Sequence, residues 1–156
     1  SMALMWATLL YPASQAATIQ FLDQISLIKY QGFPVRKAIM ASHTHALPLA
    51  ETSSTIIQNQ AREDFDLDFL CAISNSCFPN GESMKNLSEA RQRGLIDSPL
   101  PQLIQGADLL KMGIQGVKIG EYMRRVRTDQ LQEFINTREE ALTLLQQLVE
   151  NDTCGG

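Results

Sequence analysis

Apolar residues recur at three- and four-residue steps along nearly the whole chain, and glycine or proline interrupts the pattern at intervals. One helical face of the last such stretch carries Ala141, Leu144, Leu145 and Leu148. Spacing of this kind is typical of amphipathic helices packed around a core, whereas a half-buried strand needs alternating apolar and polar residues. We therefore predict an all-α fold, in which an irregular multi-helix body is followed by a small helical tail.

The segment Leu95–Pro101 contains Pro99 and Pro101 and is the best candidate for a boundary between two parts. Proline lacks a backbone N–H and restricts the residue before it, so a helix seldom continues across two closely spaced prolines. A length of 156 residues suits one domain or two small subdomains. We predict a helical body over residues 2–98 and a small helical tail over residues 99–150.

Glycine and proline stops divide the predicted body into separate helices. The predicted bounds are Met2–Tyr11, Ser14–Tyr30, Pro34–His45, Pro48–Phe65 and Ser83–Arg93. Pro48 is expected to begin a helix, because proline cannot easily lie inside one. The inward face of the second helix is expected to carry Ala17, Phe21, Ile25 and Ile28. The segment Asp64–Ser76 is ambiguous, since its apolar residues keep helical spacing while Asp66 and Asp68 alternate with apolar neighbours.

The composition favours a reduced compartment, the cytoplasm or, in a eukaryote, an organelle. Three cysteines make an odd count, and no secretory signal is visible. No apolar run approaches the about 18 residues that a membrane span needs, so no membrane association is expected. Cys71 and Cys77 are expected to be small core residues. Together with His43 and His45 these cysteines could be imagined as a zinc site, but their spacing is unlike common zinc ligand patterns, and no metal site is expected.

Charge is unevenly distributed along a chain whose formal net charge is −4. Residues 85–127 hold eight basic and four acidic residues, whereas residues 51–84 hold one basic and six acidic residues. Residues 128–156 again hold one basic and six acidic residues. A basic segment within an acidic chain can be a phosphate-binding face, and it can equally be a solvated surface.

The predicted tail consists of short helices with clear start and stop signals. Gly106 can begin the first helix and Gly113 can end it. The last helix is expected to begin with a capping box, in which Thr137 and Glu140 each bind the other's backbone N–H. Residues 151–156 are expected to fray.

A longer helix starts near Val117 and presents two rows of residues. Its inward row is expected to be Ile119, Met123 and Val126. The neighbouring row is Gly120, Arg124 and Arg127. Two arginines below a glycine, near a helix N-terminus, form a plausible cradle for a nucleic-acid phosphate. The alternatives are that Gly120 lets another helix approach and that Arg125 pairs with Glu121.

Several elements of the tail occur in a familiar order and spacing. They are Gly106–Leu110, Met112–Ile114, Gly116–Gly120 and Thr137–Leu142. Together they resemble the C-terminal tail of class II tRNA nucleotidyltransferases (CCA-adding enzymes) and their poly(A) polymerase relatives. The resemblance covers Pro101 to about Leu148, roughly a third of the chain. One departure is Val117, where a proline is common in the family.

The resemblance implies an RNA-binding C-terminal region of a CTP/ATP:tRNA nucleotidyltransferase, which positions tRNA for CCA addition at its 3′ end. The expected partners are tRNA and the protein's own N-terminal catalytic head, which would hold Mg²⁺ and CTP or ATP. This chain is expected to carry no catalytic residue or cofactor and to be inactive alone. The predicted RNA-binding residues are Lys111, Gly116, Lys118, Gly120, Arg124, Arg125 and Arg127.

Two other functions fit parts of the sequence. Met112–Gly116 resembles the hairpin of a helix-hairpin-helix module that binds DNA, although it is one residue longer than usual. Alternatively, the acidic residues of segment 51–84 belong to a helical scaffold that binds another protein. Binding to tRNA-sized RNA and to duplex DNA would separate these possibilities.

Overall fold

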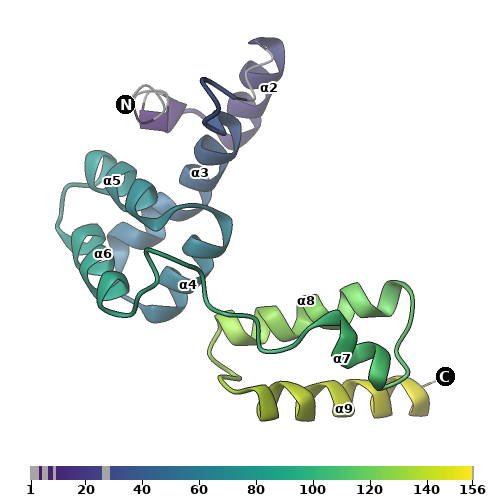
Figure 1. Ribbon diagram of the computed structural model, residues 1–156. Coiled ribbons are helices and arrows are strands. Elements are labelled where there is room, and N and C mark those ends of the chain that lie inside the picture. The colour runs from purple at the N-terminus through teal and green to yellow at the C-terminus, as the bar shows by residue number, and fades with distance from the viewer. Residues whose placement is uncertain (1–3, 5–6, 9, 26–28, 156) are drawn as a thin grey trace. The chain divides into compact units, whose positions relative to one another are not determined.

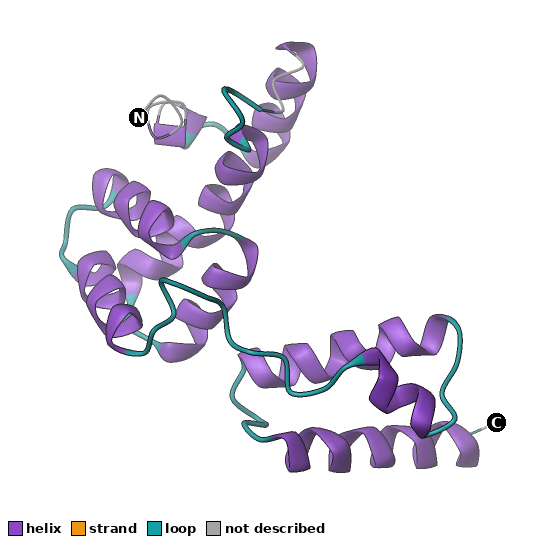
Figure 2. Cartoon of the chain, in the orientation of Figure 1, coloured by secondary structure: helices purple, strands orange, loops and turns teal. Residues whose placement is uncertain are grey.

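A computed structural model describes residues 4, 7–8, 10–25 and 29–155, which are predominantly helical (Figures 1 and 2). No strand occurs among these residues, apart from an isolated bridge between Tyr30 and Phe33. The all-α prediction is therefore confirmed. The helices are α2 (Gln15–Ile25), α3 (Val35–Glu51), α4 (Thr55–Asp64), α5 (Leu67–Cys77), α6 (Glu82–Gln92), α7 (Gly106–Lys111), α8 (Val117–Leu131) and α9 (Arg138–Cys154).

The chain forms two compact units, residues 1–99 and residues 100–156. The division falls between Pro99 and Leu100, inside the proline-containing segment. Unit 1 contains α2 to α6 and unit 2 contains α7 to α9. Each unit has its own cluster of buried apolar side chains.

Unit 1 is built around α3, which packs against α4, α5 and α6. Its fully buried large side chains include Leu22, Ile39, Leu49, Leu70 and Ile73. The ambiguous segment Asp64–Ser76 breaks at Phe65 and Asp66 and is helical from Leu67 onward, where Leu67, Leu70 and Ile73 pack into this core. Tertiary burial thus decides a segment for which the apolar pattern gave two readings.

Helix α3 continues through Pro48, so the prediction that Pro48 begins a new helix is wrong. Proline inside a helix removes one backbone hydrogen bond and crowds the preceding turn. Here a side chain from α6 stabilises the end of the helix. The amide of Asn86 donates to the carbonyls of Leu49 and Thr52, at 2.9 and 2.8 Å. The next helix begins only at Thr55.

The buried face of α2 differs from the predicted one. Ala17 and Ile25 are exposed, whereas Thr18 and Leu22 are buried. The hydroxyl of Thr18 lies 3.1 Å from Nε2 of His43, so its burial does not leave a polar group without a partner. Apolar spacing alone could not identify a threonine as the inward residue.

Two predictions for the N-terminal part extend beyond the described residues. Ile28 lies outside them, as does part of the predicted helix Met2–Tyr11. Within them, Ala7 is buried in the cluster that contains Leu22, and Phe21 packs half-buried against this cluster.

In unit 2, α8 and α9 lie side by side, and α7 packs against α8 (Figure 1). The buried core of the unit comprises Ile104, Leu109, Ile114, Tyr122, Val126, Ile135, Ala141 and Leu145. Val126 is buried as predicted, and Ile119 and Met123 pack half-buried against the same core. The predicted inward row of α8 is therefore confirmed.

The start of α9 is as predicted, but its end is not. Thr137 accepts a hydrogen bond from the N–H of Glu140 at 3.2 Å, and the Glu140 carboxylate accepts from the N–H of Thr137 at 3.1 Å. The capping box is therefore confirmed. The helix then continues to Cys154, whereas fraying was expected from residue 151. Contacts of Asp152 with α8 hold this last turn.

Candidate nucleic-acid interface

Two glycines shape the hairpin between α7 and α8. Gly113 and Gly116 have φ angles of 82° and 68°, a backbone region that L-residues with side chains disfavour. The N–H of Ile114 donates to the carbonyl of Leu109 at 3.0 Å, which closes the end of α7 and buries Ile114 in the core. Gly116 is exposed and directly precedes the first turn of α8.

Gly120 lies on the exposed side of α8 with open space in front of it. A Cβ atom at this position would have no heavy atom within 4 Å, its own turn of helix and chain neighbours aside. The alternative that Gly120 lets another helix approach has no support among the described residues. A glycine inside a helix costs about 1 kcal/mol relative to alanine. No packing contact offsets that cost here.

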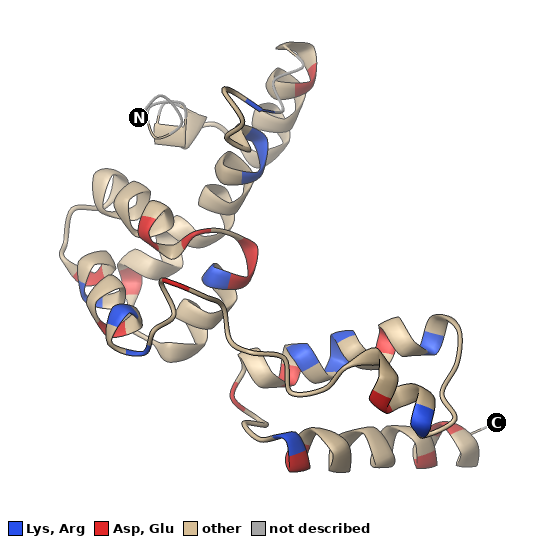
Figure 3. Cartoon of the chain, in the orientation of Figure 1, with Lys and Arg blue, Asp and Glu red and all other residues tan. Residues whose placement is uncertain are grey.

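Arg124 lies one turn beyond Gly120 on the exposed side of α8. Within the described residues its guanidinium has no hydrogen-bond or ion-pair partner. Lys111, in the last turn of α7, is likewise exposed and without such a partner there. Basic residues lie at several positions along α8 (Figure 3). Arg124 and Lys111 are thus cations that a phosphate could bind without displacing a carboxylate.

Lys118 is held by α9. Its ammonium donates to the carboxylate of Asp152 at 2.9 Å, and the hydroxyl of Tyr122 donates to the same carboxylate. The bond to Asp152 raises the pKa of Lys118, while Tyr122 and Lys118 lower the pKa of Asp152. Both charged side chains remain about half exposed, at 56% and 47%. Such an exposed pair contributes little stability, so a phosphate can compete for the lysine.

Arg125 pairs with Asp129, one turn further along α8, at 3.3 Å. The predicted alternative, a pair between Arg125 and Glu121, is wrong. Glu121 is exposed on the same helix and introduces a negative charge among the candidate cations. The Asp129 carboxylate is nearly buried at the edge of the core. Its pair with Arg125 offsets the free-energy cost of burying a charge without a partner.

Helical spacing placed Arg127 in one row with Gly120 and Arg124 as a phosphate-binding residue, but in the structure its guanidinium has other partners. Its guanidinium donates to the carbonyl of Leu100 and to the side-chain oxygen of Gln130, both at 2.9 Å. Gln130 in turn donates to the carbonyl of Pro101 at 2.8 Å. These bonds fix the first residues of unit 2 against α8. The described contacts therefore give Arg127 a role in the fold of unit 2.

Two long-range contacts of this unit could not be read from the sequence. The first joins Asp152 of α9 to Lys118 and Tyr122 of α8. The second joins Arg138 of α9 to Asp108 of α7. Two nitrogens of Arg138 donate to the Asp108 carboxylate at 2.7 and 3.1 Å. Together with the N–H of Gln105, these bonds lower the pKa of Asp108 to about 2. The partners are separated by 30 residues or more, and no local spacing marks them.

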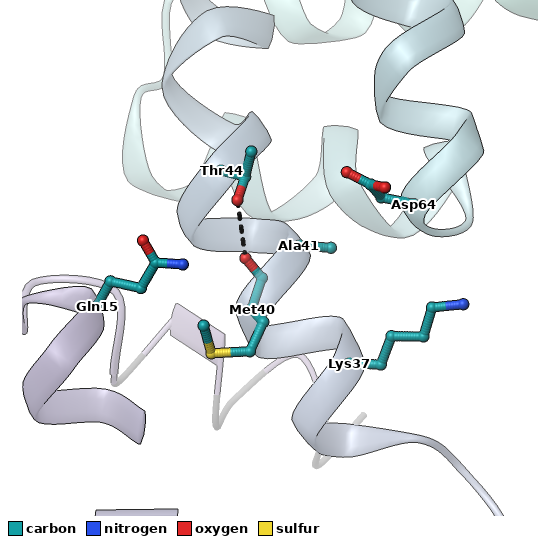
Figure 4. Close-up of a pocket in the computed structure, with 6 residues that line it drawn as sticks. All are labelled: Gln15, Lys37, Met40, Ala41, Thr44 and Asp64. Carbon is teal, nitrogen blue, oxygen red and sulfur yellow. Dashed lines mark hydrogen bonds between the residues drawn. The ribbon is translucent and has the colours of Figure 1, made fainter. Parts of the chain in front are cut away.

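Unit 1 contains an open hollow of about 210 Å³ beside α3 (Figure 4). It is lined by Gln15, Lys37, Met40, Ala41, Thr44 and Asp64. Asp64 already has a partner, since its carboxylate lies 2.6 Å from Nε2 of the nearly buried His45. Other acidic residues of segment 51–84 also have partners, among them Asp66 with Arg62, and Glu82 with the hydroxyl of Ser53.

The cysteines and histidines are not gathered into one site. Within the described residues, no group of three or more His, Cys, Asp or Glu side chains is arranged to hold a metal ion. His43 contacts Thr18, and His45 contacts Asp64. Cys71 is buried, and burial raises the pKa of its thiol to about 12. Among the described residues, no helix combines the length and the apolar character of a membrane span.

Comparison of the chain with known protein families, with curated proteins and with solved structures finds no match. The motifs of residues 101–148 and the geometry of unit 2 are therefore the observations that bear on function.

Proposed function

We propose that this chain is an RNA-binding helical region that grips tRNA for nucleotide addition at its 3′ end. The role is the one implied by the resemblance of residues 101–148 to the tail of class II tRNA nucleotidyltransferases. Nucleotide transfer itself would belong to a separate catalytic head, with Mg²⁺ and CTP or ATP. The chain's own contribution would be to hold the RNA in position.

The observation that carries the proposal is the open row of Gly120 and Arg124 on α8. Gly120 leaves the helix surface uncovered, and Arg124 presents an unpaired guanidinium one turn away. Double-stranded RNA is recognised mostly through its shape and its phosphates, because its deep major groove is closed to side chains. An exposed arginine beside bare backbone suits a phosphate of this kind.

Neighbouring cations extend the same surface. Lys111 is exposed at the end of α7, and Lys118 shares an exposed ion pair with Asp152. Arg125 is exposed too, but its partner Asp129 is nearly buried. Exchange of the Asp152 carboxylate for a phosphate costs little, because an exposed pair is weak. At Arg125 a phosphate would bind beside Asp129, because loss of the pair would leave a nearly buried carboxylate without a partner. We assign these three cations and Arg124 to the phosphate-binding face and leave Arg127 out of it.

The proposal predicts a specific effect of Arg124→Ala on tRNA binding. Loss of one phosphate contact should weaken binding and reduce the slope of log affinity against log salt by roughly one unit or slightly less. The measurement is the affinity for tRNA across a salt series, together with the melting temperature. Arg124 is exposed, so the melting temperature should not change.

Arg91→Ala is the matched control. Arg91 is also an exposed arginine, in the last turn of α6, within the basic segment 85–127. The substitution Arg91→Ala should leave both the affinity for tRNA and the slope of log affinity against log salt unchanged. Equal slopes for Arg124→Ala and the unsubstituted chain, with unchanged stability, would show that Arg124 belongs only to a solvated surface.

A second candidate, a hairpin module that binds DNA, is favoured by one observation. Gly113 and Gly116 both have positive φ angles in the connection between α7 and α8. Glycines in such a hairpin allow the backbone to approach a phosphate closely. Duplex DNA of equal length, included in the same titrations, distinguishes the two functions. Tighter binding to duplex DNA than to tRNA would favour the second.

A further inference from the structure

The connection between α5 and α6 contains an asparagine directly before a glycine, Asn80–Gly81. Both residues are exposed. Asparagine is a thermolabile residue, because the backbone nitrogen of the residue that follows it can attack its side-chain amide. Glycine hinders this attack least, since it has no side chain. Whether the attack occurs in a folded chain depends on how the nitrogen and the amide are held.

The backbone nitrogen of Gly81 is available for reaction. Its N–H donates to no group among the residues that the structure describes. A Cβ atom at Gly81 would have no heavy atom within 4 Å, its chain neighbours aside, so the space around this residue is open. A small ring that joins this nitrogen to the side chain of Asn80 can therefore form without displacing another part of the chain.

The side-chain amide of Asn80 is held by two hydrogen bonds. Its Oδ1 accepts the N–H of Glu82 at 3.1 Å, and its Nδ2 donates to the carbonyl of Ala50, near the end of α3, at 2.7 Å. The bond from Glu82 places a donor where negative charge develops when the amide carbon is attacked. It also closes a turn of the chain that contains both the amide carbon and the Gly81 nitrogen. The two reacting atoms are thereby kept close together.

We propose that Asn80 is a site of spontaneous deamidation, with water as the co-reactant. The Gly81 nitrogen gives its proton to hydroxide and bonds to Cγ of Asn80, while Nδ2 takes a proton from water and leaves as ammonia. Water then opens the resulting succinimide ring at either carbonyl, which gives aspartate or isoaspartate at position 80. The net reaction consumes water and releases ammonia. This modification is independent of the proposed function.

The product cannot keep the contact with α3. An ionised carboxylate has no hydrogen to donate, so an oxygen atom would face the carbonyl oxygen of Ala50 in place of the amide donor. The bond from Glu82 can persist, because a carboxylate still accepts it. Deamidation would therefore add a negative charge before α6 and release the α5–α6 connection from the end of α3.

Asn136 provides a matched control within the same chain. It is also exposed and lies in a connection, between α8 and α9. The residue that follows it is Thr137, whose branched side chain crowds the backbone nitrogen. The N–H of Thr137 donates to the Glu140 carboxylate at 3.1 Å, so this nitrogen is already engaged. Asn136 should therefore react far more slowly than Asn80.

The test is incubation of the purified full chain at mildly alkaline pH in water enriched in heavy oxygen, followed by digestion and mass spectrometry. The peptide that contains Asn80 should exchange an NH2 group for a labelled OH group, while the peptide that contains Asn136 stays unchanged. Asn80→Gln should abolish the conversion, because glutamine would have to form a larger ring that closes more slowly. A synthetic peptide of residues 78–85 is treated in parallel as the unfolded reference. Conversion of this peptide with an intact Asn80 in the folded chain, or equal conversion at Asn80 and Asn136, overturns the inference.

Discussion

At the scale of single residues, Asn86 is a buried polar side chain that joins three helices of unit 1. It is fully buried and makes four hydrogen bonds. Its amide nitrogen donates to the carbonyls of Leu49 and Thr52, and its oxygen accepts from the N–H of Ser54 and the amide of Gln58. It therefore satisfies the carbonyls near the end of α3 and ties the start of α4 to α6.

Asn86→Ala should destabilise the chain strongly. The substitution leaves buried donors and acceptors without partners, and each costs about 1–3 kcal/mol. A loss of about 3 kcal/mol or more in the free energy of unfolding is expected, measured by denaturant titration. Asn136→Ala, at an exposed position, serves as the control and should change this free energy by less than about 0.5 kcal/mol. Similar values for both variants would contradict the role given to Asn86.

Hydropathy could not single out Asn86. The sequence predicts the helix that contains it, because the apolar spacing and Gly94 mark its extent. The same reasoning treats a polar residue on a helix as solvent-facing by default. Thr18 was missed for the same reason, since its burial depends on a partner 25 residues away. A polar residue can be recognised as buried only when its hydrogen-bond partners are known.

At the scale of elements, local signals predicted starts better than ends. The capping box at Thr137 joins residues three apart, so the sequence contains all of it. The ends of α3 and α9 depend instead on Asn86 and Asp152, which bond with residues some 30 or more positions away. Such contacts overrode the proline signal at Pro48 and accompany the extension of α9 to Cys154. Tertiary contacts rather than local propensity decided both.

The pair of Asp108 and Arg138 joins α7 to α9 and makes the stability of unit 2 depend on pH. Hydrogen bonds from Arg138 and Gln105 lower the pKa of Asp108 from an ordinary 3.8 to about 2. A lowered pKa in the folded state means that the ionised form is the stabilising one. Its contribution is complete above about pH 4 and is lost as pH falls from there through about 2.

Asp108→Asn tests this dependence. The melting temperature of the variant should lie below that of the unsubstituted chain at pH 6, and the difference should shrink between pH 4 and pH 2. Glu139→Gln is a control for surface charge, because Glu139 is an exposed acidic residue in the first turn of α9. A difference that stays constant down to pH 2 would mean that Asp108 keeps an ordinary pKa.

At the scale of the whole molecule, the sequence predicts the fold class but only part of the candidate interface. Helical periodicity and the two prolines are local features, and they account for the all-α character and the division near Pro99. Gly120 and Arg124 are both exposed, as the predicted row of candidate phosphate-binding residues requires. Arg127 departs from this prediction, because its partners Leu100 and Gln130 were not predictable from helical spacing alone. Which cations are free depends on tertiary contacts.

The chain contains two overlapping Asp-x-Asp sequences, Asp64–Asp66 and Asp66–Asp68, and their positions bear on whether it can catalyse nucleotide transfer. Two-metal nucleotide transfer needs paired carboxylates that project into a shared site with the substrate phosphates. Asp64 instead ends α4 and contacts His45, while Asp66 and Asp68 lie at the start of α5. Asp66 pairs with Arg62 at 3.8 Å, and the Asp68 carboxylate accepts the N–H of Phe69 at 2.9 Å. Both are therefore engaged in local contacts at a helix start.

The purified chain should accordingly not transfer CMP or AMP to tRNA, even with Mg²⁺ and saturating CTP or ATP. The measurement is incorporation of radiolabelled nucleotide into tRNA that lacks its 3′ CCA, under single-turnover conditions with excess protein. Binding of the same tRNA, followed in parallel, shows that a negative result does not reflect absent substrate contact. If labelled product appears, Asp66→Asn with Asp68→Asn decides its origin. Incorporation that this double substitution abolishes would place catalysis within the chain and refute a purely RNA-binding role.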